Sequence, residues 1–87
     1  MTYSSQLTSL VETPEAKMKA IVRGVRAEAN ISQEELGIRI GRYLCIPAID
    51  QKAVSRWENP KEPTIIPSCY LGAVAEICGV SAERLMV

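Results

Sequence analysis

Apolar side chains recur at intervals of three and four residues along most of this chain, and this spacing constrains the fold more than any other feature. The clearest run lies in the N-terminal half of the chain. No alternating pattern typical of a strand extends beyond a few residues. The sequence therefore predicts an all-α fold of about five short helices. The apolar stripe of the first helix consists of Met18, Ile21, Val22, Val25 and Ala29.

Capping residues indicate where the first two helices begin. Thr13, followed by a proline and a glutamate, predicts a first helix over about 14–29. Ser32–Glu35 has the spacing of a capping box and starts a second helix. In this helix Gly37 lets another helix approach closely. Gly41 ends the second helix, unless the four-residue apolar spacing carries it a turn further.

The C-terminal half contains further start and stop signals. Asp50 is a suitable N-cap for a third helix over about 51–59, which a loop with two prolines follows. A fourth helix opens at Pro67 or Ser68 and ends at Gly79, and Ser81 caps a last short helix.

Length and composition limit the organisation of the chain. Eighty-seven residues provide one modest core, so we expect an N-terminal arm over 1–12 and one domain over 13–87. No apolar run is long enough to span a membrane, and no basic leader with an apolar core precedes the domain. The three cysteines are an odd number without close pairing, which fits reduced thiols. These features predict a cytoplasmic protein, in which Cys45 and Cys78 behave as small buried hydrophobic residues.

The sequence offers little for catalysis. The chain has no histidine, no cysteine pair with zinc-ligand spacing and no glycine-rich phosphate loop. We therefore expect neither an enzyme nor a bound metal or cofactor.

Charge is distributed unevenly although the formal net charge is zero. Lys17 to Lys61 contains nine basic and five acidic residues, whereas Glu62 to Val87 contains one basic and three acidic residues. A neutral total does not favour nucleic acid, but the basic excess lies in the part of the chain that contains the second and third helices.

Two segments together resemble the helix-turn-helix of the phage lambda repressor and Cro family. In Ala53–Asn59, Val54 and Trp57 share one helical face and point inward, while polar residues occupy the other face. The capped segment Asn30–Gly37 lies upstream and provides the first helix of the pair. The resemblance covers roughly Ile21 to Leu85. It implies a lambda repressor-like DNA-binding domain, of prokaryotic or phage origin, whose helix at 51–59 reads DNA.

The resemblance also implies roles for individual residues. The reading positions of the family correspond to Gln51, Lys52, Ser55 and Arg56, whose side chains can bond base edges in the major groove. The family's ion pair between the first helix and the end of the recognition helix corresponds to Arg26 and Glu58. Core positions are Leu36, Ile40, Val54 and Trp57.

Other polar residues are candidates for contacts to DNA phosphates. Gln33 stands at a helix start, where backbone amides and the helix dipole favour an anion, and Asn59 and Lys61 follow the recognition helix. The stretch 42–49 makes the connection to the recognition helix longer than the tight turn of the family. Within it, Arg42 and Tyr43 either contact phosphates or cover the core.

The sequence therefore predicts a sequence-specific regulator of transcription that binds double-stranded DNA, as a homodimer because one module contacts few phosphates. The N-terminal arm and the apolar end Leu85–Val87 are the expected dimer surfaces. The alternative is a protein-interaction module on the same fold, such as an antirepressor, an antitoxin-like partner binder or a coactivator adaptor. Neutral charge and the long connection favour that alternative.

Overall fold

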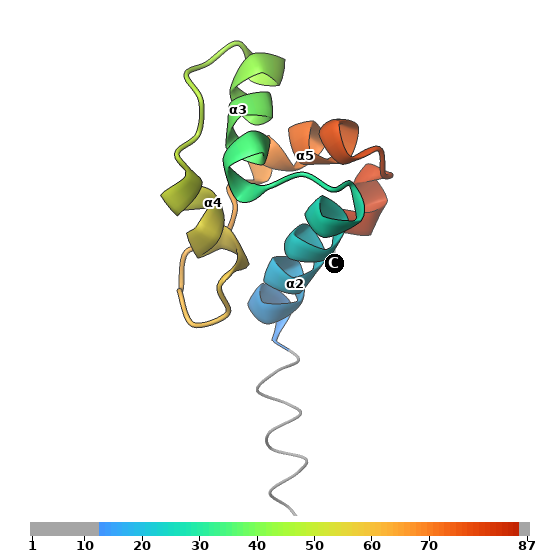
Figure 1. Ribbon diagram of the computed structural model, residues 1–87. Helices are drawn as coiled ribbons and strands as arrows, with labels where there is room; N and C mark the ends of the chain where they lie inside the picture. Colours follow the sequence, from blue (N-terminus) through green and yellow to red (C-terminus); the bar gives the residue numbers. More distant parts are fainter. Residues whose placement is uncertain (1–12, 86–87) are drawn as a thin grey trace, which may run out of the picture.

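The computed structural model describes residues 13–85, and this part of the chain forms four α-helices and two 3₁₀ segments without a strand. The prediction of an all-α fold is confirmed. The last predicted helix and the start of the fourth are 3₁₀ segments, however, and not α-helical. The N-terminal arm, Met86 and Val87 lie outside the described residues. The α-helices are α2 (Pro14–Glu28), α3 (Gln33–Leu44), α4 (Gln51–Glu58) and α5 (Leu71–Cys78), and the 3₁₀ segments are η1 (Ser68–Tyr70) and η2 (Ala82–Leu85) (Figure 1).

Side-chain caps hold the helix starts as the sequence predicts. The Thr13 hydroxyl accepts a hydrogen bond from the amide of Ala16 at 3.2 Å, and the Ser32 hydroxyl accepts one from the amide of Glu35 at 3.0 Å. The Asp50 carboxylate accepts one from the second residue of α4 at 3.4 Å. Each bond satisfies an amide that has no partner inside its own helix.

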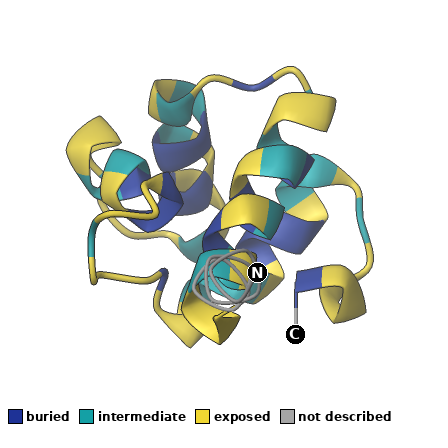
Figure 2. Ribbon diagram, turned by 90° about the horizontal axis from the view of Figure 1, so that it is seen from below, coloured by how far each residue is buried: buried dark blue, intermediate teal, exposed yellow. Residues whose placement is uncertain are grey.

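The core lies between the four helices, whose buried faces turn toward one another (Figure 2). Helix α3 packs against both α4 and α5, while α2 packs against α4, α5 and η2. The four predicted core positions are buried, and the Trp57 ring lies 5.6 Å from that of Tyr70 at a tilted angle. This packing fixes the inner face of α4, and it leaves the opposite face for solvent.

The connection between α3 and α4 is folded back along α3. Helix α3 passes Gly41 and ends at Leu44, and Cys45 adopts a left-handed conformation with φ 58°. The amides of Ile46 and Ile49 then donate to the carbonyls of Gly41 and Gly37, at 2.9 and 3.0 Å. We call residues 45–50 the linker. In Figure 1 it runs beside α3 before α4 begins.

Gly37 permits this close approach, because a Cβ added there would lie 2.1 Å from the carbonyl oxygen of Ile49. At Gly41 an added Cβ would lie 2.8 Å from the Cα of Ala48. The expectation that Gly37 accommodates another helix is therefore wrong. Linker backbone occupies this position instead. A non-helical segment can bring its backbone closer to α3 than a helix can, because the side chains of a helix surround its backbone.

Two further expectations need correction. Cys45 is exposed, and not buried as expected, because it ends α3 in the left-handed turn. Cys78 is half-buried and packs against the core, and this burial raises the pKa of its thiol. Leu85 belongs to the core of its own domain and is completely buried. It is therefore not available as the dimer surface that the sequence suggested.

Candidate nucleic-acid interface

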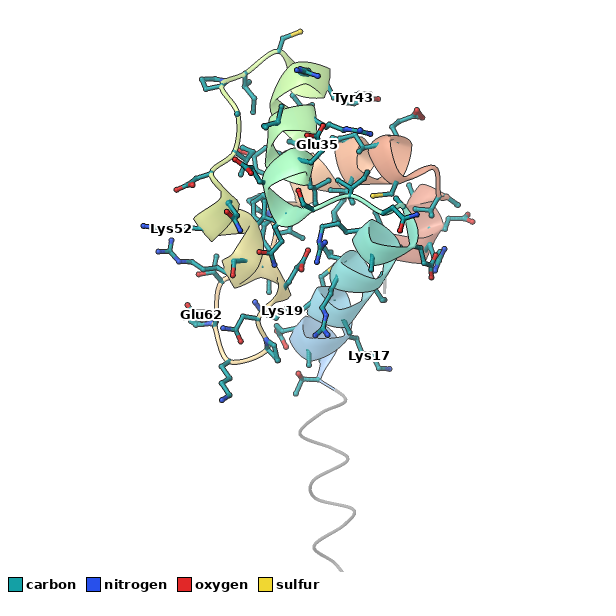
Figure 3. All side chains as sticks on the ribbon, in the orientation of Figure 1. Lys17, Lys19, Glu35, Tyr43, Lys52 and Glu62 are labelled. Carbon is teal, nitrogen blue, oxygen red and sulfur yellow. The ribbon has the colours of Figure 1, made fainter. Side chains whose placement is uncertain are left out.

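The outer face of α4 carries the residues that the sequence assigned to base contacts. Gln51, Lys52 and Arg56 are exposed, and Ser55 is half-buried. The Lys52 side chain projects away from the body of the domain (Figure 3). The opposite face holds Val54, Trp57 and Glu58, all buried. Helix α4 is thus attached by one face and presents two cations and an amide on the other.

The C-terminal end of α4 is joined to α2 by an ion pair between the buried Glu58 and the half-buried Arg26. Arg26 donates from Nε to Oε2 of Glu58 at 2.6 Å and from Nη2 to Oε1 at 2.9 Å. The exposed fractions of the two side chains are 16% and 3%. The predicted ion pair is therefore present. Its hydrogen bonds raise the pKa of the Arg26 guanidinium, against the opposing effect of burial.

Two more bonds extend this ion pair, one to the turn between α2 and α3 and one to the first residue of α3. Arg26 Nη1 donates to the carbonyl of Ile31 at 2.8 Å, and Gln33 Nε2 donates to Oε1 of Glu58 at 3.0 Å. Gln33 was expected to hold a phosphate. One of its two amide hydrogens is instead used inside the domain, which leaves the second hydrogen and the carbonyl oxygen for a ligand.

Sequence reasoning missed the role of Lys19. Its Nζ donates to the carbonyl of Arg56 at 2.7 Å and to the carbonyl of Thr64, and only 3% of the residue is exposed. Burial lowers the pKa of this ammonium, and the negative charge of Glu62 opposes that shift. Lys19 is therefore a structural cation and not part of a basic surface. Its position three residues before Val22, on the apolar stripe of α2, is the signal that could have indicated this.

The loop after α4 is ordered by its own hydrogen bonds. The side-chain oxygen of Asn59 accepts from the amide of Lys61 at 3.0 Å, and its carbonyl accepts from the amide of Glu62 at 3.0 Å. Pro60 takes the second position of this turn, where its fixed φ is suitable. The Lys61 side chain is exposed. The turn thus presents the amide group of Asn59 and the ammonium of Lys61 beside the end of α4.

An open hollow of about 320 Å³ lies where α2, α3 and α4 meet. Three of the predicted contact residues line it, namely Gln33, Ser55 and Asn59. Arg23, which the sequence did not single out, adds an exposed guanidinium at the same place. The hollow therefore brings hydrogen-bond donors from three helices to one place on the surface. Its remaining lining residues are Arg26, Glu58 and Pro60.

Arg42 and Tyr43 are not brought to this place. Both lie in the last turn of α3 and both are exposed, so neither covers the core. Tyr43 is 53% exposed, and in Figure 3 its side chain lies on the opposite side of the molecule from Lys52. This placement does not favour a contact between Tyr43 and a duplex bound by α4.

Other kinds of site find no support within residues 13–85. No group of three or more His, Cys, Asp or Glu side chains in this range is arranged to hold a metal ion. None of the helices described here has the length and apolar character needed to cross a membrane. Comparison of the chain with protein families, curated protein sequences and solved structures gives no match to any of them.

Proposed function

We propose that this chain is a sequence-specific regulator that binds double-stranded DNA, with α4 as the helix that enters the major groove. The observation that carries the proposal is the division of α4 into a fixed inner face and an exposed outer face with Gln51, Lys52 and Arg56. A major groove about 12 Å wide accepts one helix. Glutamine can form two hydrogen bonds to adenine, and arginine or lysine can bond guanine, which makes these three residues suitable for reading bases.

Groups beside α4 are suited to hold the DNA backbone. Asn59 and Lys61 lie in the turn after the helix, and the hollow between α2, α3 and α4 adds Arg23 and part of Gln33. Contacts of this kind orient a protein on the duplex without reading its sequence. We further propose a lambda repressor-like arrangement in which the linker replaces the tight turn, and a dimer that places two copies of α4 about one helical turn apart.

The test is selection from a randomised pool of duplex DNA, followed by binding of the recovered sequence at several salt concentrations. We expect an enriched palindrome and an affinity that falls steeply with salt, because bound phosphates release counterions. Lys52→Ala and Arg56→Ala should each reduce binding of the recovered site and relax its preference at one base position.

Arg84→Ala is the matched control for these substitutions. It also removes one arginine charge, but from η2, which packs against α2 and α5. Its only described partner is Glu28, with both side chains exposed. Equal loss of binding in Arg84→Ala and Arg56→Ala would contradict the assignment of α4 to the groove.

A protein-interaction module on the same fold is the second candidate function. The zero net charge and the exposed apolar side chains of Tyr43, Ile46 and Ile65 favour it. If the pool yields no enriched sequence, and a protein partner binds with little dependence on salt, this second function replaces the first.

A further inference from the structure

Lys19 joins the two ends of the segment that runs from the last turn of α4 into the loop after it. The carbonyls that it binds belong to Arg56, in the last turn of α4, and to Thr64, eight residues later. One ammonium therefore holds both ends of residues 56–64, which contain Asn59 and Lys61. We call this segment the closed loop.

The closed loop has few other attachments to the rest of the domain. Its internal turn is held by the two hydrogen bonds to Asn59, and Trp57 and Glu58 fasten only its first part. From Asn59 to Thr64, every residue is exposed except Glu62, which is half-buried. The bond from Lys19 to Thr64 thus ties the second part of the closed loop directly to the end of α4, and the chain enters the core two residues later at Ile66.

A buried lysine needs a reason, because an apolar side chain of similar size would avoid the cost of removing a charge from water. Here the ammonium is bound by carbonyls and lies near the negative charge of Glu62. Carbonyls in the last turn of a helix attract a cation, because the helix dipole is negative there. An ammonium can also reach two carbonyls in different directions, which no apolar side chain can replace.

We infer that Lys19 is a positioning residue for DNA-backbone contacts, and that it acts by holding the closed loop so that Lys61 and Asn59 meet phosphates while α4 lies in the groove. This inference rests on the proposed function. Lys19 itself touches no DNA, because its ammonium is buried and bound. Its effect is on the number of phosphate contacts and not on the choice of bases.

The experiment measures binding of the duplex recovered by selection, as a function of salt, for the wild type, Lys19→Met, Lys61→Met and the double variant. Each lost phosphate contact by a cation lowers the slope of log affinity against log salt by about 0.9. We expect Lys19→Met to lower the slope by about that amount, with unchanged base preference. The double variant should have the slope of Lys61→Met alone, because both changes remove the same contact. Lys17→Met, which replaces an exposed lysine on α2, is the matched control, and its salt slope should differ from that of Lys19→Met.

A readout without DNA tests the position of the closed loop directly. The amide of Glu62, which donates to the carbonyl of Asn59, should exchange its hydrogen at least about tenfold faster in Lys19→Met than in the wild type. Amides of Leu36 and Ile40 in the core report global stability, and the Glu62 rate is compared with theirs. If Lys19→Met does not fold, Lys19→Gln is measured instead, since it keeps an amide donor but has a shorter side chain.

The outcomes separate the two proposals. A wild-type slope in folded Lys19→Met, or additive slopes in the double variant, would overturn the role of Lys19 and leave the proposed function intact. Unchanged exchange at Glu62 would likewise overturn it. Failure of the wild type to select any duplex would overturn the proposed function, and the DNA role of Lys19 with it.

Discussion

Two glycines within helices provide a matched test of the linker. Gly37 in α3 faces linker backbone, whereas a Cβ added at Gly24 in α2 would meet no atom within 4 Å. Replacing a glycine inside a helix by alanine stabilises the helix by about 1 kcal/mol. We expect Gly24→Ala to gain about this amount. Gly37→Ala gains it too, but the new Cβ must push the carbonyl of Ile49 away from a separation of 2.1 Å.

The cost at Gly37 has two parts. Movement of the linker removes the hydrogen bond from the amide of Ile49 to the carbonyl of Gly37, worth about 1 kcal/mol. Overpacking adds about 1–3 kcal/mol. After the gain in helix propensity, Gly37→Ala should be less stable than the wild type by about 1–3 kcal/mol. The two alanine variants should therefore differ by about 2–4 kcal/mol, which corresponds to at least about 8 °C in Tm for a domain of this size.

Urea unfolding followed by the fluorescence of the single, buried Trp57 measures both variants. An unchanged slope of the unfolding free energy against urea concentration would show that unfolding exposes the same amount of surface in each variant. If Gly37→Ala is as stable as Gly24→Ala, the linker does not lie against α3 and the account of the connection is refuted.

Three further predictions concern charged residues. Glu58→Ala should lower the free energy of unfolding by about 3 kcal/mol, the low end for breaking a buried pair, because the half-buried Arg26 guanidinium loses its carboxylate but keeps its bond to Ile31, and an unchanged Tm would contradict this. Lys19→Met should cost more stability at about pH 10 than at about pH 7. Because the pKa of Lys19 is lowered in the folded state, the folded protein binds fewer protons than the unfolded chain just below the ordinary pKa of 10.5, and wild-type stability therefore rises with pH there. Urea titrations of both proteins at the two pH values would detect the difference. Arg23→Gln should lower the salt slope of DNA binding by about one without changing Tm, since the residue is exposed at the edge of the hollow, and a wild-type slope would exclude Arg23 from the backbone contacts.

The starts of α2, α3 and α4 could be predicted because their causes are local. Thr13, Ser32 and Asp50 each bond an amide two or three residues away, so the signal lies within one turn of sequence. Gly79 ends α5 with φ 69°, again as its residue type indicates. The inner face of α4 also followed from spacing alone.

The rest depends on contacts that extend beyond one helical turn of sequence. The path of the linker is set by Gly37 and Gly41, which lie directly against linker backbone. The spacing of residues within α3 does not reveal which segment will cover these two glycines. Lys19 bonds residues 37 and 45 positions away, so its place on the apolar stripe could indicate its burial but not which carbonyls it binds. Within the candidate site, the resemblance led to the pair of Arg26 and Glu58, but nothing in the sequence placed Gln33 in that pair or Arg23 beside the hollow.

The linker also has a consequence for the order in which the domain folds. Its bonds to α3 join residues close in sequence, as from Ile49 to Gly37, whereas the pair of Arg26 and Glu58, which are 32 positions apart, closes a much longer loop. Short loops close at lower entropic cost, so we expect α3, the linker and α4 to form a structured unit before α2 attaches. Substitutions at Gly37 would then slow folding, while those at Glu58 would mainly accelerate unfolding. The segment that replaces a tight turn would in this way act as the folding nucleus of the domain.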